Sequence, residues 1–166
     1  MTAAAACVAV VAVVLPAPDD MLMDAAVARC RNLRGAPGRV QLRQYLDAER
    51  EVGVPLRLRG MVLAAACHES GFSPAAVGDG GNAVGMLQQH APWYPHVDRR
   101  DPWQAARSWL ERVAVTVRKA RRCPRPWVAA WAWVAQGPRR YTCREPRHLA
   151  VLRKFRRAAE AARRAQ

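Results

Sequence analysis

The sequence predicts a single, mainly α-helical domain. Its 166 residues suit one domain built around one hydrophobic core. Hydrophobic residues make up 51% of the chain, which excludes general disorder. Alanine is abundant, runs of β-branched residues are few after the N-terminus, and Gly and Pro fall between the apolar segments. These three features together favour helices joined by short connections.

The N-terminal residues predict an export signal. Residues 3–15 form an apolar run that is too short to span a bilayer, and Pro16 and Ala17 follow it. We therefore expect residues 1–17 to be a signal peptide and residues 18–166 to be the mature domain. No positive residue precedes the run, so a buried helix is the alternative interpretation.

Helical periodicity then predicts the elements in order. Gly53 and Gly71 are natural helix ends, and Asp101-Pro102 supplies an N-cap followed by proline at the first helical position. Residues 71–100 are rich in Gly and Pro and predict an irregular segment that can hold a small hairpin. Apolar residues recur with helical spacing in segments 21–32, 40–53, 56–70, 101–122, 126–137 and from 145 onward.

Four cysteines remain after residue 17, and an even number in an exported domain suggests disulfides. Three connectivities are possible. We favour Cys123 with Cys143, which would clip two neighbouring helices, and Cys30 with Cys67. The alternative is four buried thiols in a cytosolic protein.

The chain is strongly basic. Its formal net charge is +14, and nearly all of its positive charge comes from arginine. Biased coding can produce this composition, and so can selection for binding a polyanion such as nucleic acid, anionic lipid or cell wall. Charge alone does not choose among these partners. We expect the basic C-terminal helix to present a solvated face.

Glu69 is the candidate catalytic residue. It ends an apolar helix and stands just before the Gly-rich segment, which leaves room for a substrate. Apolar surroundings favour the protonated form of a carboxyl group, and glycoside cleavage requires a carboxylic acid that stays protonated near neutral pH. By itself, a glutamate at a helix end is more often a solvated or capping residue.

Residues 63–90 resemble the soluble lytic transglycosylase family of the lysozyme-like superfamily, within a similarity that covers roughly residues 40–140. The shared elements occur in order: Glu69-Ser70, Phe72, Pro74, the Gly-rich turn at residues 78–81 and Gly85-Met86-Leu87-Gln88. The resemblance implies a lysozyme-like fold. It also implies cleavage of the β-1,4 bond between N-acetylmuramic acid and N-acetylglucosamine in peptidoglycan.

The resemblance also assigns roles to individual residues. Glu69 would be the single acid and base, and Ser70 would orient the substrate or polarise the acid. Gln88 would bind sugar from the opposite side of the cleft, and Met86 would form part of its wall. The alternative for Ser70 and Gln88 is a local cap and a buried hydrogen bond.

A further family motif, an aromatic residue followed by Asn-Ala-Gly, matches only partly. The corresponding region is residues 131–138, where Gly137-Pro138 fits but the asparagine is missing. Which aromatic side chain lies against the sugar is therefore open. Trp133 and Tyr141 are the candidates, although tryptophans at helical spacing usually belong to a core.

The number of carboxyl groups indicates the reaction type. Ordinary glycoside hydrolases use two carboxylates, and Asp79, in an Asp-Gly turn, is the only other acid nearby. With one carboxyl group, the muramyl N-acetyl group would assist and the product would be a 1,6-anhydro sugar, without a cofactor. The alternative is a hydrolytic lysozyme related to the goose type, in which Asp79 places water.

Other classes of protein are weaker candidates. A zinc protease motif needs a second histidine four residues after His68, but that position is Phe72, so no metal site is expected. A basic, non-catalytic module that binds nucleic acid or cell wall stays possible, although no nucleic-acid motif is present. The predicted partner is peptidoglycan, with no nucleic acid and no stable membrane insertion. The predicted state is a monomer that is secreted or periplasmic and is encoded by a bacterium or a phage.

Overall fold

The structure, a computed structural model, describes residues 19–165 except 32, 35 and 137–141. The predicted signal peptide lies outside these residues. Within them the fold is mainly helical, as predicted, and no described helix has the length and apolar character needed to cross a membrane. The helices are α1 (Asp19–Arg29), α2 (Arg39–Val52), α3 (Met61–Ser70), α4 (Pro102–Lys119), α5 (Pro126–Gln136) and α6 (Arg147–Arg164).

The prediction of one continuous helix over residues 56–70 is wrong. A short 3-10 turn, Leu56–Leu58, comes first, and α3 begins only at Met61. Between them Gly60 has a φ of 90°, which glycine adopts far more readily than other residues. A Cβ atom on Gly60 would lie 2.8 Å from Cδ2 of Leu22, so the break also allows close packing against α1.

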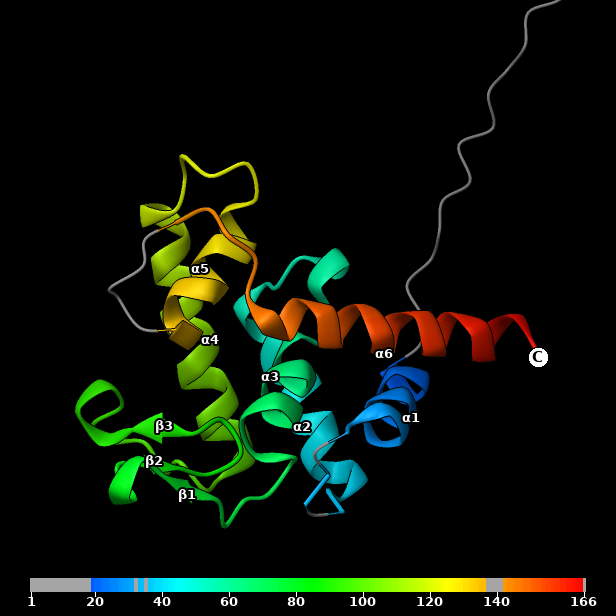
Figure 1. Cartoon of the computed structure of the whole chain (residues 1–166), viewed down its shortest axis with the longest axis horizontal. Coiled ribbons are helices and arrows are strands. Elements are labelled where there is room, and N and C mark those ends of the chain that lie inside the picture. Colours follow the sequence, from blue (N-terminus) through cyan, green and yellow to red (C-terminus); the bar gives the residue numbers. More distant parts are fainter. Residues whose placement is uncertain (1–18, 32, 35, 137–141, 166) are drawn as a thin grey trace, which may run out of the picture.

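A small antiparallel sheet forms within the Gly-rich segment. Its strands are β1 (Val77–Gly78), β2 (Ala83–Val84) and β3 (Gln89–His90), in that order. The expected hairpin is therefore present, with a third strand added to it. The sheet lies at the lower left of Figure 1, beside the lower end of α4 and away from α1.

Helix α3 forms the centre of the hydrophobic core. Its residues from Met61 to Cys67 are all buried. It packs against α6, α2 and α1, while α4 packs against both α2 and α5. Figure 1 shows α6 crossing above α3 and extending to the C-terminus. The last turn of α3 therefore emerges between α6 and the segment that carries the sheet.

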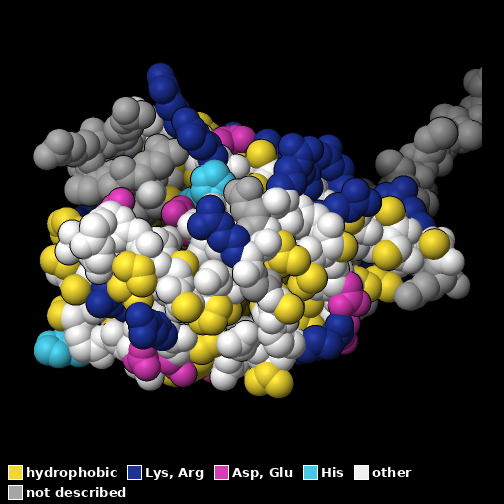
Figure 2. Space-filling view, turned by 60° about the horizontal axis from the view of Figure 1, so that its bottom comes forward, with side chains coloured by type: hydrophobic (Ala, Val, Ile, Leu, Met, Phe, Trp, Pro, Cys, Tyr) yellow, Lys and Arg dark blue, Asp and Glu magenta, His cyan; other side chains and the backbone are white. Residues whose placement is uncertain are grey.

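Basic side chains gather on one part of the surface. Figure 2 shows many Lys and Arg side chains toward the right of the molecule, where α1 and α6 lie in Figure 1. Helix α6 buries an apolar face that includes Leu152 and Phe155, and it exposes Arg153 and Lys154. The basic C-terminal helix is thus a packed element with a solvated charged face, as expected.

A buried carboxyl group caps the N-terminus of α3. Glu49, fully buried on α2, accepts hydrogen bonds from the backbone N–H groups of Gly60 at 2.7 Å and Val62 at 2.8 Å. Burial raises the pKa of Glu49 to about 7, although these two donors and Arg59 favour its ionised form. Free N–H groups at a helix start need such partners, so Glu49 fixes where α3 begins.

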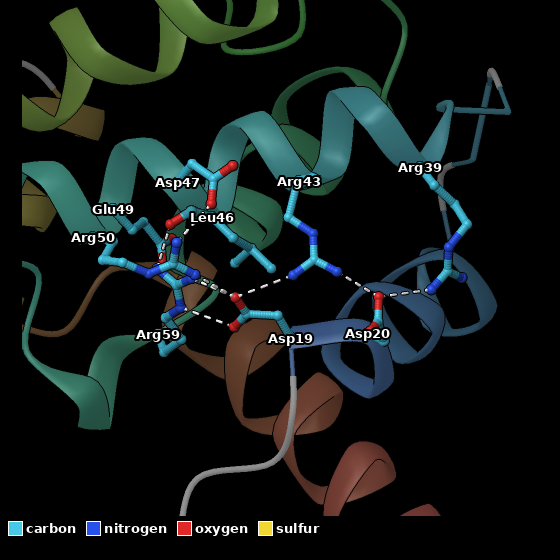
Figure 3. Close-up of polar contacts among 9 residues, drawn as sticks. All are labelled: Asp19, Asp20, Arg39, Arg43, Leu46, Asp47, Glu49, Arg50 and Arg59. Atoms are coloured by element: carbon cyan, nitrogen blue, oxygen red, sulfur yellow. Dashed lines mark hydrogen bonds and ion pairs between the residues drawn. The ribbon is translucent and has the colours of Figure 1, made fainter.

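An ion-pair network joins this cap to α1 (Figure 3). Nη2 of Arg59 lies 2.7 Å from Oδ2 of Asp19, and Arg50 and Arg43 reach the same carboxylate. Burial opposes ionisation of Asp19, but Arg59, Arg50 and Arg43 together hold its pKa below the usual value. The network ties α1, α2 and the start of α3 together.

Both predicted disulfides are present. Cys30 pairs with Cys67 at a Cα–Cα distance of 5.7 Å, and Cys123 pairs with Cys143 at 5.3 Å. The first joins the end of α1 to α3, two residues before Glu69, and the second joins the segments that precede α5 and α6. A bridge of this kind is expected to stabilise a fold by about 3 kcal/mol, because it restricts the unfolded chain.

Candidate active site

A cleft with a volume of about 540 Å³ opens at the end of α3. Helices α3, α4, α5 and α6 and the segment that carries the sheet all contribute side chains to it. Its lining combines carboxyl, imidazole, amide, aromatic and cationic groups, which is the mixture expected of a site for a polar ligand. Its lining includes Glu69, Asp79, Gln88, His90, Trp93, Tyr94, Arg112, Lys119, Trp133 and His148.

Glu69 lies at the last turn of α3 and lines the cleft. Its side chain is 30% exposed, so it can meet a ligand while most of its surface is covered. The helix ends one residue later, at Ser70, because Gly71 and Phe72 both have positive φ angles, 61° and 64°. Phe72 is completely buried, which anchors this turn and places the carboxyl group at the edge of the cleft.

The carboxyl group of Glu69 is held by a histidine from α6. Nε2 of His148 lies 2.8 Å from Oε1 of Glu69. The His148 side chain is only 5% exposed, and its ring stacks on Trp131 with centroids 5.8 Å apart. A ring that is packed this way has little freedom, so it fixes the orientation of the carboxyl group. Sequence reasoning missed His148, whose only signal was a histidine on the apolar face of the last helix.

His68 completes a cluster of three side chains, which we call the His–Glu–His cluster (His68, Glu69 and His148). The rings of His68 and His148 meet edge to face with centroids 4.5 Å apart. One ligand atom from each residue lies within 4.8 Å of the other two, a spacing that could accept a metal ion. Partial burial, together with the nearby His148, lowers the pKa of His68, although Glu69 opposes this shift.

Gln88 lines the cleft on the side of the sheet. Its amide nitrogen donates to the carbonyl oxygens of Gly85 at 2.9 Å and Ala76 at 3.2 Å. A Cβ atom on Gly78 would lie 2.5 Å from Oε1 of Gln88, so a glycine there lets the amide pack against the strand. Gln88 thus makes part-buried hydrogen bonds to the backbone and also borders the cleft.

Asp79 is a second carboxyl group in the same cleft. Its Oδ2 atom lies 3.0 Å from Nε2 of His90, and its side chain is 69% exposed. Both Asp79 and Gln88 have positive φ angles, 48° and 47°, in a region that costs a non-glycine residue roughly 1 kcal/mol or more. The chain thus accepts backbone strain at two residues that border the cleft.

Trp93 is an exposed aromatic residue in the cleft that sequence reasoning missed. It is 54% exposed, and the Arg112 guanidinium lies 4.7 Å from its ring centroid. The neighbouring Tyr94 is more covered, and burial raises its pKa to about 12, although Arg112 and Gln89 oppose this shift. The pair of aromatic residues between Pro92 and Pro95 in an irregular segment was the available signal.

Of the two predicted aromatic site residues, Trp133 lies among the described residues and Tyr141 does not. Trp133 lines the cleft but is only 8% exposed, and its Nε1 donates to the carbonyl oxygen of Thr142 at 2.8 Å. This placement makes Trp133 mainly a core residue. Tyr141 lies outside the described residues, as do Gly137 and Pro138.

Ser70 and Met86 lie behind the cleft, and neither is among the described residues that line it. The Ser70 hydroxyl donates to the carbonyl oxygens of Met86 at 2.9 Å and Ala66 at 3.1 Å. Both residues are buried. Ser70 therefore connects the end of α3 to the segment that carries Gln88.

No model of a known protein family matches the chain, and neither a curated protein nor a solved structure does. The resemblance of residues 63–90 to the soluble lytic transglycosylases accordingly stays a prediction.

Proposed function

We propose that this chain is an exported peptidoglycan lytic transglycosylase with a lysozyme-like fold, in which Glu69 is both acid and base. The observation that carries the proposal is the setting of Glu69. It is a partly exposed carboxyl group at the edge of a 540 Å³ cleft, oriented by a buried imidazole. A general acid needs both features, access to the substrate and a fixed direction.

The rest of the cleft suits a glycan that carries carboxylate groups. Trp93 offers an exposed apolar ring face, on which a sugar can lie. Arg112 and Lys119 supply positive charge from α4, which fits the lactyl and peptide carboxylates of peptidoglycan. The basic surface over α1 and α6 would add weaker, long-range attraction to an anionic wall.

The chemistry follows from one carboxyl group acting twice. Glu69 donates its proton to the glycosidic oxygen while the muramyl N-acetyl group stabilises the developing positive charge at the anomeric carbon. The resulting carboxylate then takes the proton of the muramyl 6-hydroxyl, whose oxygen closes onto that carbon. The products are a new N-acetylglucosamine 4-hydroxyl end and a 1,6-anhydro ring, and no water is consumed.

Hydrolysis is the second candidate, and one observation favours it. Asp79 lines the same cleft as Glu69 and is paired with His90. A carboxylate beside an imidazole can hold and activate a water molecule. In that case the chain would be a lysozyme-like hydrolase, and its products would carry ordinary reducing ends.

Export is supported by the two disulfides, which persist in oxidising compartments. A basic binding module for nucleic acid remains the alternative from a different class. Its binding would fall steeply with salt, because phosphate contacts release counterions. It would also leave peptidoglycan intact.

Mass spectrometry of the products from purified peptidoglycan tests the proposal. We expect muropeptides that end in 1,6-anhydro-N-acetylmuramic acid, which are lighter by one water than reducing-end products. Reducing ends would establish the hydrolase instead. A Glu69→Gln preparation, purified in parallel, controls for contaminating wall enzymes, and no products from either protein would remove the assignment.

A further inference from the structure

We infer that the His–Glu–His cluster (His68, Glu69 and His148) is a reversible binding site for a divalent transition-metal ion of the zinc type, which occupies the catalytic carboxyl group and blocks it. Metal binding stands on the geometry of the cluster alone. The blocking of cleavage rests on the proposed function, because it requires Glu69 to be the acid.

The three donor groups of the cluster suit a zinc ion. Two imidazole nitrogens and one carboxylate oxygen are the ligands that Zn²⁺ prefers, whereas Mg²⁺ and Ca²⁺ prefer oxygen ligands alone. Ligand atoms of these three residues already lie within 4.8 Å of one another. In a tetrahedral zinc site the ligand atoms lie roughly 3.3 Å apart. His68 would therefore have to move inward, while Nε2 of His148 and Oε1 of Glu69, now 2.8 Å apart, would separate slightly.

Two of the three ligands are held in place and the third can move. His148 is buried and stacked on Trp131, and its Nε2 is already 2.8 Å from Oε1 of Glu69. His68 is exposed, so its side chain can rotate inward without disturbing the core. Two ligands are therefore preorganised, and the third can close on the ion.

The surroundings of the His148 ring indicate why binding would be reversible. Metal-bound histidines usually donate their other ring nitrogen to a fixed acceptor, which strengthens the site. Among the described residues, the buried Nδ1 of His148 has no hydrogen-bond partner. The cluster also supplies three protein ligands and leaves a fourth position to water. Because no fixed acceptor in the described part of the chain holds the other ring nitrogen of His148, we expect the ion to bind less tightly and therefore reversibly.

The sequence alone argued against a metal site, because Phe72 stands where a zinc protease has its second histidine. In the folded chain the second imidazole comes from α6 instead, 79 residues after Glu69. The helix that orients the proposed acid thus also completes the proposed metal site.

Calorimetric titration of the full-length oxidised protein, without a polyhistidine tag, tests the metal site directly. With ZnCl₂ we expect one ion per chain, and with CoCl₂ we expect visible absorption bands of a low-coordinate ion. His68→Gln and His148→Gln should each weaken zinc binding by at least about tenfold, since each removes one ligand. His96→Asn, which removes an exposed histidine outside the cluster, should bind like the parent.

Peptidoglycan cleavage with and without zinc tests the blocking. Each variant's rate with zinc is divided by its own rate without zinc, so basal differences cancel. We expect inhibition of the parent and of His96→Asn, weaker inhibition of His68→Gln, and no effect of MgCl₂. Absence of zinc binding to the parent, or undiminished binding to His68→Gln, would overturn the metal site. A parent that binds zinc yet never cleaves peptidoglycan would leave the site standing and refute the proposed function.

Discussion

Nε2 of His148 lies 2.8 Å from Oε1 of Glu69, and 79 residues separate the two along the chain. Glu69 lies in the last turn of α3 and His148 in the first turn of α6, so the contact exists only when α6 is docked across α3. Correct folding of the last helix is therefore a condition for an oriented carboxyl group. The predictions below test this arrangement and the packing that produces it.

Replacing Glu69 by glutamine should remove cleavage and keep the fold. The amide has nearly the same shape but cannot donate a proton as an acid, so we expect the rate to fall by roughly 10²- to 10⁴-fold. Clearing of a peptidoglycan suspension measures the rate, and thermal unfolding checks the fold. A variant that clears the suspension at the parent rate would contradict the assignment.

Two substitutions of His148 separate orientation from packing. His148→Leu removes the hydrogen bond to Glu69, and we expect the cleavage rate to fall roughly 10- to 100-fold, the equivalent of one strong hydrogen bond. His148→Gln can still place an amide nitrogen near the position of Nε2 and should keep more of the rate. Calorimetry with a soluble glycan fragment should give similar affinities for both variants. If His148→Leu and His148→Gln cleaved peptidoglycan at the same rate as the parent, His148 would not orient the acid.

Trp93→Ala should weaken glycan binding without loss of stability. The ring is 54% exposed in the free protein, so truncation removes binding surface more than core packing. We expect roughly 5- to 30-fold weaker binding of a soluble glycan fragment. Trp103→Ala is the matched control, because Trp103 packs under Arg107 outside the cleft. Equal losses for the two variants would count against a sugar platform at Trp93.

Gly60→Ala should destabilise the fold more than Gly53→Ala does. Both glycines have positive φ angles, 90° and 77°, which cost alanine about 1–2 kcal/mol. Only at Gly60 would the new Cβ also meet Leu22, at 2.8 Å, whereas nothing lies within 4 Å at Gly53. Urea unfolding of the oxidised proteins should show Gly60→Ala to be less stable by a further 1–3 kcal/mol or so. Equal losses would mean that α1 and α6 tolerate a side chain there.

Glu49 should make stability fall as the pH rises. Its pKa is raised to about 7 in the folded protein from 4.5 in a model peptide, so the folded chain keeps a proton that the unfolded chain has lost. This contribution is complete below pH 4.5, disappears as the pH passes 7, and amounts to at most about 3 kcal/mol.

The measurement for Glu49 is the free energy of unfolding of the parent minus that of Glu49→Gln, from pH 4 to pH 8. Subtraction removes the contribution of His68, whose lowered pKa makes stability rise with pH in the same range. We expect the difference to decrease toward high pH. A flat difference would show that Arg59 offsets the effect of burial, so that Glu49 is ionised in the folded protein.

Several features of the fold could be predicted because their causes are local. Asp101 accepts from the backbone N–H of Gln104 at 2.7 Å and starts α4 as expected, and Gly71 ends α3. The break at Gly60 could not be predicted, because the pattern of apolar residues continues through it. Its reason is the close approach of Leu22, which belongs to another helix.

The candidate site divides in the same way. Glu69 was recognisable because it ends an apolar helix just before a Gly-rich segment. Ser70 looked like part of the site by its position in the same motif, yet its hydroxyl points to carbonyl oxygens behind the cleft. Trp93 and His148 were missed because neither belongs to the motifs from which the site residues were predicted.

The amino-acid sequence by itself determined the helical class, the approximate helix positions and the place of the candidate acid, because caps, breakers and periodicity act over a few residues. It also favoured the correct disulfide pairs. Only the tertiary structure decided which imidazole meets Glu69, which aromatic ring faces the cleft and which carboxyl group caps α3. Those contacts join helices far apart in the chain, and the direction in which the helices pack decides which side chains meet.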